Sequence, residues 1–280
     1  MLAAIAALVF GQQIPDVRYL PIKQTELQFP VFAGAQEFAM GIKRQQSRTM
    51  GLFVNQLESG AYGDKIPINY NDVRVGHTMW SVSPGVYGSS SCMAISCDAS
   101  RNQAWEYRKT IYGLKHKASR TWYVDDNGKL LGETCDVEMA TGRWTMDVSY
   151  GAEEYTVTSS GPNKPRRTMT VTPGCGIEAL TLAPFKPMLK PDPAGKESEV
   201  LMKEKEFYLL DPVSAAPVKY VARVSGSFSG EMFERKWTGR EVEIVGGTEK
   251  FTAWLTHDGM WIKAVLASAG TYLILDQKPL

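Results

Sequence analysis

The stretch Arg120–Thr134 constrains the fold of this chain more than any other, because it has the form of a strand, a tight turn and a second strand. Thr121–Val124 contains only β-branched and aromatic residues, which suit a half-buried strand. Asp125–Gly128 follows and ends in Asn-Gly, a pair typical of the type I′ turns that join antiparallel strands. Leu130 and Leu131 then open a return strand, so the sequence predicts a β-hairpin here.

A second segment near the C-terminus repeats this pattern. Phe251–Thr256 and Met260–Leu266 are apolar and flank His257-Asp258-Gly259, which predicts a second hairpin. Two explanations of the likeness stay open. The chain carries a diverged duplication, or two antiparallel meanders share the same turn chemistry.

Alternation of apolar and polar residues predicts most of the remaining strands, and it is cleanest in Arg143–Tyr150. Ala33–Arg48 is predicted as a short helix, Pro84–Ser90 as a turn, and Met169 as an inward-facing residue of its strand. The sequence therefore predicts a mainly β protein with few short helices, built on a large antiparallel curved sheet or open barrel, in one piece or two similar halves. Further predicted strands are His77–Ser83, Ser91–Cys97, Trp105–Tyr112, Glu153–Thr158, Arg167–Thr172 and Thr271–Asp276.

The chain divides into four parts by composition. Residues 1–11 contain an uncharged apolar run, Met1–Phe10, followed by a small residue, as in the apolar core of a signal peptide. A buried first strand or helix is the alternative. Residues 12–183 form an N-terminal β region and residues 197–280 a C-terminal one. Between them, residues 184–196 hold four prolines and form a linker, since proline cannot sit in a central strand.

The four cysteines match an extracytoplasmic compartment, periplasmic or secreted, because an even count suits disulfide bonding. Their spacing matches no zinc motif, and four cysteines allow three disulfide connectivities. Buried free thiols are the alternative, since cysteine packs as a small apolar residue. The candidate disulfide residues are Cys92, Cys97, Cys135 and Cys175.

Charge and motifs exclude several classes of function. The net charge of +1 gives no basis for nucleic-acid binding, and no apolar run approaches the length of a membrane-spanning helix. The sequence has no nucleophile-elbow, zinc-protease or phosphate-loop motif, and its three histidines share no ligand spacing. We therefore predict no catalytic residue, no metal site and no cofactor.

The tryptophans are the remaining lead to a binding function. They line an apolar cavity for a lipid-like ligand, or they fill the core of a large sheet, where each aromatic buries a large area. The tryptophans on the candidate strands, predicted to contact a ligand, are Trp105, Trp122, Trp144, Trp254 and Trp261.

Over Ala104–Gln277 the chain resembles uncharacterised bacterial secreted or periplasmic proteins with a curved antiparallel half-barrel like that of lipoprotein carriers. The resemblance rests on the serial strands, the N-terminal apolar run and the two aromatic–xxDxG–apolar hairpins, Trp122–Leu131 and Trp254–Ile262. It implies a curved, barrel-like sheet and carries no functional residue across.

Three functions are compatible with these features. The first is an exported, non-enzymatic binding module for an apolar small molecule or an apolar segment of a partner. The second is a structural or assembly protein of the cell envelope, acting through an exposed sheet edge or apolar patch. The third is a hydrolase, which requires a histidine within hydrogen-bond reach of a serine, cysteine or carboxylate in a cleft.

Overall fold

The computed structural model describes residues 17–19, 46–54, 73–171, 204–257, 261–266 and 271–275, except the turn residues 108, 128, 152, 153, 163, 233, 247 and 248. This part of the chain consists of strands and turns and contains no helix. The strands are β1 (Val17–Tyr19), β2 (Gln46–Val54), β3 (Val73–Tyr87), β4 (Ser90–Tyr107), β5 (Thr110–Val124), β6 (Leu130–Met139), β7 (Gly142–Tyr150), β8 (Tyr155–Gly161), β9 (Lys164–Val171), β10 (Glu204–Leu210), β11 (Pro217–Met232), β12 (Arg235–Gly246), β13 (Glu249–Thr256), β14 (Trp261–Leu266) and β15 (Thr271–Leu275).

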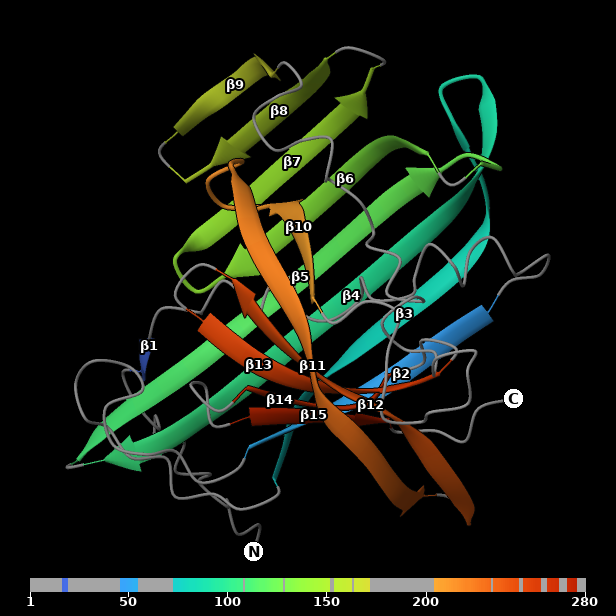
Figure 1. The fold of residues 1–280 in the computed structure, drawn as a ribbon. Coiled ribbons are helices and arrows are strands. Elements are labelled where there is room, and N and C mark those ends of the chain that lie inside the picture. Colours follow the sequence, from blue (N-terminus) through green and yellow to red (C-terminus); the bar gives the residue numbers. More distant parts are fainter. Residues whose placement is uncertain are drawn as a thin grey trace, which may run out of the picture.

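All these strands belong to one curved sheet (Figure 1). Its order is β10-β11-β12-β13-β14-β15-β2-β3-β4-β5-β6-β7-β8-β9, and neighbours on this path are antiparallel. β1 lies off the path and pairs in parallel with the start of β5. Strands from the two predicted β regions thus share a single sheet, with β15 hydrogen-bonded to β2. The predicted fold class, a large antiparallel curved sheet, is confirmed.

One face of the sheet is apolar and buried across β4–β8; we call it the inner face. On β5, the even-numbered residues from Leu114 to Val124 are buried, while Lys115 and Lys117 are exposed. On β7, Met146 and Val148 are buried while Asp147 and Ser149 are exposed, which confirms the alternation predicted for that strand. The opposite face, the outer face, carries the polar residues of the same strands.

Several predicted boundaries are wrong because the strands are longer than expected. Pro84–Tyr87 continues β3, so the turn before β4 is confined to Gly88 and Ser89. Trp105–Tyr112 is not one strand but the junction of β4 and β5, and the chain reverses there with Lys109 at a φ of 62°. Aromatic and β-branched residues on both sides of a two-residue turn imitate an uninterrupted strand.

Two further predictions are corrected, one in β2 and one in β9. The helix expected over Ala33–Arg48 is contradicted at its C-terminal end, where Gln46–Arg48 begins β2; the rest of it lies outside the described residues. Met169 does not face a core and is 39% exposed, because β9 is the last strand in the sheet order. The predicted segments 1–11 and 184–196 also lie outside the described residues.

Both predicted hairpins are present, as β5–β6 and β13–β14. The type I′ turn predicted for the first is wrong, because Asn127 lacks the positive φ that such a turn requires. The Asp125 carboxylate instead accepts hydrogen bonds from the backbone N–H groups of Asn127 (2.9 Å) and Lys129 (2.8 Å). The backbone N–H of Asp125 donates to the Lys129 carbonyl at 2.9 Å, so this turn spans five residues.

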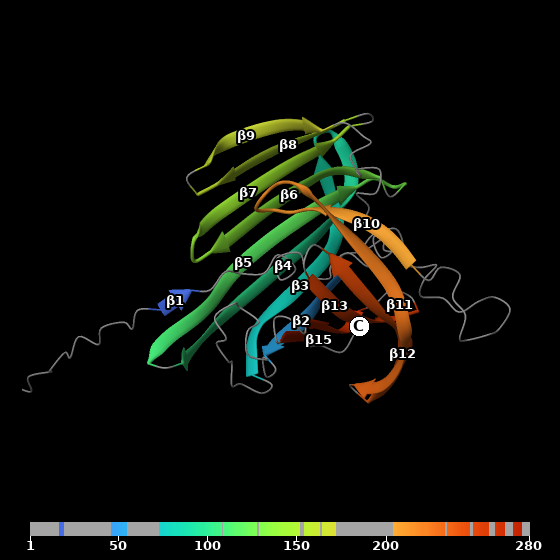
Figure 2. The same cartoon turned by 60° about the vertical axis from the view of Figure 1, so that its left-hand side comes forward.

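The β10–β11 hairpin folds back over the inner face of the N-terminal strands (Figures 1 and 2). Its turn, Leu210–Ala216, which we call the hairpin tip, packs against β5–β8. Leu210 is fully buried and Ala215 is 4% exposed in that contact. Distant parts of the sequence meet here, and the contact also contains the polar network described next.

Candidate functional site

Two charged side chains occupy inner-face positions where the alternation of their strands calls for apolar residues. Arg120 on β5 lies between Ala118 and Trp122 on the same face, and Glu133 on β6 lies in phase with Cys135. Both are almost completely buried, with exposed fractions of 4% and 1%. Burial of a charge is costly unless it is paired and hydrogen-bonded, so their partners matter.

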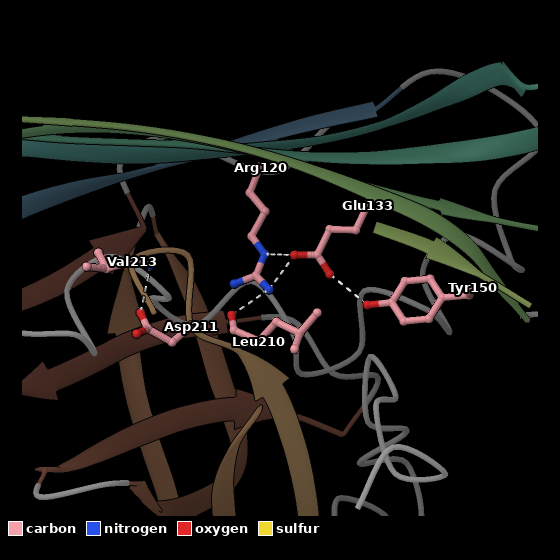
Figure 3. Close-up of polar contacts among 6 residues, drawn as sticks. All are labelled: Arg120, Glu133, Tyr150, Leu210, Asp211 and Val213. Atoms are coloured by element: carbon pink, nitrogen blue, oxygen red, sulfur yellow. Dashed lines mark hydrogen bonds and ion pairs between the residues drawn. The ribbon is translucent and has the colours of Figure 1, made fainter. Parts of the chain in front are cut away.

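Arg120 and Glu133 form a buried ion pair that links four strands (Figure 3). Arg120 Nε donates to Glu133 Oε1 at 2.5 Å, and the Tyr150 hydroxyl on β7 donates to Glu133 Oε2 at 2.9 Å. Arg120 Nη2 donates to the backbone carbonyl of Leu210 at 2.9 Å. The guanidinium also lies over the Trp122 ring, 4.9 Å from its centroid. The network therefore joins β5, β6 and β7 to the hairpin tip.

The hairpin tip has its own internal hydrogen bonds. The Asp211 carboxylate accepts from the backbone N–H groups of Val213 (3.1 Å) and Ser214 (2.8 Å). Backbone bonds from Asp211 N–H to the Ala216 carbonyl (2.8 Å) and from Ala215 N–H to the Asp211 carbonyl (2.7 Å) close the turn. Ala215 has a φ of 58°, in the left-handed region. The tip is thus a preformed turn that presents Leu210 and Ala215 to the sheet.

An apolar surface surrounds the point where the tip docks. The buried members of the cluster from β5–β8 range in size from Ala118 to Tyr155. Met139, Trp144, Tyr150 and Val213 pack around them and are partly buried. The inner face contributes Ala118, Cys135, Val137, Met146, Val148, Tyr155 and Val157. The tip therefore covers a continuous apolar patch with the ion pair at its border.

Burial and the ion pair act in opposite directions on the protonation of the network. Burial raises the pKa of the Glu133 carboxyl, against the lowering effects of the Arg120 charge and of hydrogen bonds from Tyr150, Arg120 and Trp122. Burial also raises the pKa of Tyr150 well above its ordinary value, and the Glu133 charge adds to that effect. The network has no exposed acid or nucleophile for a substrate, so it is suited to holding the tip in place.

Cys92, Cys97 and Cys135 are free, buried thiols in the structure, and Cys175 lies outside the described residues. Cys97 and Cys135 are the cross-strand neighbours of Arg120 on β4 and β6. They are two strand spacings apart, about 10 Å, which exceeds the reach of a disulfide. Burial raises the pKa of Cys97, and it raises that of Cys135 to about 12, so neither is a thiolate at neutral pH. A disulfide through Cys175 stays a prediction.

The structure brings two of the five predicted ligand-binding tryptophans near the hairpin tip. Trp122 is 1% exposed beside Arg120, and Trp144 packs against the apolar cluster under the tip. Trp254 belongs to a different cluster, where its ring stacks on Phe228 with centroids 5.5 Å apart. The side chains of Trp105 and Trp261 lie outside the described residues. Ligand contact by these tryptophans stays a prediction.

One histidine meets part of the geometric requirement for a hydrolase. His77 Nδ1 lies 3.1 Å from Ser100 Oγ, and the two residues face each other across β3 and β4. No carboxylate in the described part of the chain is hydrogen-bonded to this ring to orient it. Nor do the described ranges contain three or more His, Cys, Asp or Glu side chains placed to hold a metal ion. The same ranges contain no helix long and apolar enough to cross a membrane.

Sequence reasoning missed the network although it began at the right hairpin. The carboxylates of this hairpin turn, Asp125 and Asp126, are not part of the network. The useful signal was the phase of Arg120 and Glu133, each two residues from buried apolar neighbours on its strand. Leu210 had no such signal, because it takes part through its own backbone carbonyl, which the tertiary fold brings to Arg120.

Comparisons with known proteins support the fold and go no further. A scan against protein-family models gives no match, and a search of curated proteins also gives none. The fold is similar to the crystal structure of a beta-barrel-like protein of the domain of unknown function DUF1849 from Brucella abortus. The TM-score is 0.50 with 11% sequence identity, over 81% of this chain and 93% of that chain. The shared feature is a barrel-like, all-β architecture.

Proposed function

We propose that this protein is an exported, non-enzymatic binding module that holds the apolar part of a ligand or partner on the inner face of β5–β8. One observation carries the proposal: this apolar face is covered by a small hairpin tip joined to it through an arginine and a backbone carbonyl. In the bound state, the ligand's apolar part takes the place of the tip. Export rests on the apolar run Met1–Phe10.

The contacts that hold the tip are few enough for a ligand to replace them. Burying the Leu210 side chain contributes about 2–3 kcal/mol, and a hydrogen bond from a charged donor contributes about 1.5–3 kcal/mol. The smaller side chains of Ala215 and Val213 add to the apolar contact. The turn bonds of Asp211 lie within the tip and persist when it moves. A ligand whose apolar contacts exceed these few kcal/mol binds with net affinity, since micromolar binding corresponds to about 8 kcal/mol.

Trp122 and Trp144 border the surface that is exposed when the tip moves away. They are the tryptophans that we expect to contact the ligand. Trp144 is partly buried and lies at the edge of the apolar cluster. Trp122 is covered by the Arg120 guanidinium, which also holds the tip. Movement of the tip therefore changes the surroundings of both rings, and tryptophan fluorescence reports ligand entry.

The test compares two neighbouring leucines of β10 that point to opposite faces. Leu210→Ala loosens the tip, whereas Leu209→Ala makes the same truncation at a buried position outside the cluster. The apolar probe N-phenyl-1-naphthylamine is titrated into both variants and the wild type. We expect Leu210→Ala alone to increase probe binding, by about tenfold for each 1.4 kcal/mol by which the tip is weakened.

Equal probe binding by the two leucine variants would contradict the proposal, because it would show that the tip does not control access. Native mass spectrometry of the protein recovered from its expression host gives a second measure. It reports a co-purified apolar ligand and the mass of the mature N-terminus in one experiment. A mature protein that retains Met1–Phe10 would contradict export with cleavage.

A second candidate function is assembly through the sheet edge at β9. This strand ends the sheet order, and Met169 on it is 39% exposed. An unpaired edge strand is a template for another chain, and an envelope protein is the partner that export implies. Sedimentation of the wild type and of Met169→Lys tests it: assembly that the lysine abolishes supports this candidate, and a monomer at all concentrations opposes it.

A further inference from the structure

A groove of about 400 Å³ lies across four neighbouring strands, β5–β8, and its lining is polar. The side chains that line it are all short: none is longer than aspartate. They include Thr134, Asp136, Thr145, Asp147, Thr158 and Ser160. These residues alternate with the buried ones on their strands, so they belong to the outer face, behind the surface that the hairpin tip covers.

The strand register arranges these side chains in two rows. In the first row Thr134 is opposite Asp147, which is opposite Thr158. In the second row Asp136 is opposite Thr145, which is opposite Ser160. Neighbours within a row are about 5 Å apart, so each row sets a carboxylate among hydroxyl groups at a regular spacing.

The groove exists because short side chains stand where an exposed sheet face ordinarily carries long ones. Aspartate is depleted in strands, and two of them occupy central positions here. The row beside the one that contains Asp136 and Thr145 has the long charged side chains usual for an exposed face. It consists of Lys117, Glu138 and Arg143. Such residues would fill the hollow if they continued across it. Two aspartates at strand centres, in positions with no packing role, point to function.

The hydrogen bonds already present orient part of the lining. Thr145 Oγ1 and Ser160 Oγ lie 2.7 Å apart, so one hydroxyl donates to the other. Asp136 is held by the Arg143 guanidinium, whose Nε lies 2.8 Å from Oδ1. Asp147 is exposed on the floor between Thr134 and Thr158. The groove thus offers carboxylate acceptors and hydroxyl groups that both donate and accept.

We propose that this groove binds a saccharide. The hydroxyl groups of a sugar donate to the carboxylate of Asp147 and accept from the threonine and serine hydroxyls beside it. The lining has no aromatic ring, so the sugar lies with its polar edge against the strands. The volume is within the range of small-molecule sites. This site is independent of the apolar site proposed above, because the two lie on opposite faces of the sheet.

The test uses the full chain, labelled with ¹⁵N, and three neutral disaccharides: maltose, lactose and chitobiose. We expect at least one of them to shift the amide resonances of the groove residues on β6–β8 in a saturable manner. Thr145→Lys places a long side chain in the groove and abolishes these shifts. Thr156→Lys makes the same change on the outer face of β8 outside the groove, and leaves them intact.

Asp147→Asn tests the carboxylate without changing its size. Losing a hydrogen bond to a charged acceptor weakens binding by about tenfold or more. Circular dichroism and tryptophan fluorescence confirm that each variant folds. The proposal is overturned if none of the disaccharides shifts the groove resonances, or if Thr145→Lys binds as well as Thr156→Lys. It is also overturned if Ca²⁺ alone shifts them and the sugars do not.

Discussion

Arg120 connects the N-terminal strands to the hairpin tip through Glu133 and the Leu210 carbonyl. Replacing it with methionine keeps the volume but leaves Glu133 buried without its cation. We expect Arg120→Met to lower the free energy of unfolding at neutral pH by about 3–5 kcal/mol. Urea unfolding of the two proteins measures the difference. Arg143→Met is the matched control, since it removes an exposed ion pair with Asp136 that is worth about 0–1 kcal/mol.

The same variant has a predictable response to pH. Burial raises the pKa of Glu133, and removing Arg120 takes away a charge that lowers it. A carboxyl whose folded pKa is above its unfolded value contributes stability below the unfolded value and loses it as pH rises through the folded one. Acidification toward pH 5 should therefore narrow the stability gap between Arg120→Met and the wild type. A gap that is independent of pH would contradict this protonation.

The buried thiols give a second prediction. Burial raises the pKa of Cys135 to about 12 and that of Cys97 also rises. The protonated, buried thiols contribute their full share of stability below pH 8.5–9, where they are also protonated in the unfolded chain. Above that range the free energy of unfolding falls by about 1.4 kcal/mol per pH unit for each thiol. In a Cys175→Ser background, Cys135→Ala should reduce the slope of unfolding free energy against pH between 9 and 11.

Thiol reactivity provides an independent check of that prediction. The three described cysteines are buried, so Ellman's reagent at pH 8 should label the Cys175→Ser protein only after denaturation. Rapid labelling of the native protein would contradict this burial, because it would show that at least one of Cys92, Cys97 and Cys135 is accessible to solvent.

Among the elements, the sequence predicted strands better than turns, and the reasons are local. Arg143–Tyr150 alternates cleanly because β7 has one buried and one wet face, so its burial follows from its residue types. The β4–β5 turn was not predicted because Lys109 adopts a positive φ, which is uncommon for lysine. The docking of the hairpin tip was not predictable at all, since it depends on a backbone carbonyl and on the curvature of the whole sheet.

The strained turns are themselves open to test. Lys109 is exposed and has a φ of 62°, a region that glycine occupies without steric cost. We expect Lys109→Gly to raise the free energy of unfolding by roughly 0.5–1 kcal/mol. Lys117→Gly, at an exposed position within β5, should instead destabilise by a similar amount. Thermal unfolding followed by circular dichroism distinguishes them, and a loss of stability in Lys109→Gly would oppose the strain argument.

At the scale of the molecule, β15 joins the two β regions into one sheet. It pairs with β14 on one side and with β2 on the other. Leu273 is at its centre, opposite Ala264 and Leu52. Proline there removes a backbone donor and leaves its acceptor unpaired, so we expect Leu273→Pro to lower the free energy of unfolding by at least about 1–3 kcal/mol and to abolish cooperative unfolding. Leu273→Val keeps the donor and should unfold in one transition; similar behaviour of the two would show that the regions fold apart.

The pairing of β15 with β2 also determines when the sheet can be completed as the chain is made. Every other link on the path joins strands that are consecutive or nearly so along the chain, but Val54 pairs with Thr271. β2 is therefore synthesised long before its partner β15. The edge of β2 that pairs with β15 stays unpaired while β3–β14 are synthesised. An open edge is a site for aggregation. Production of this protein should accordingly depend on chaperones that hold nascent chains, more than its simple up-and-down strand order would suggest.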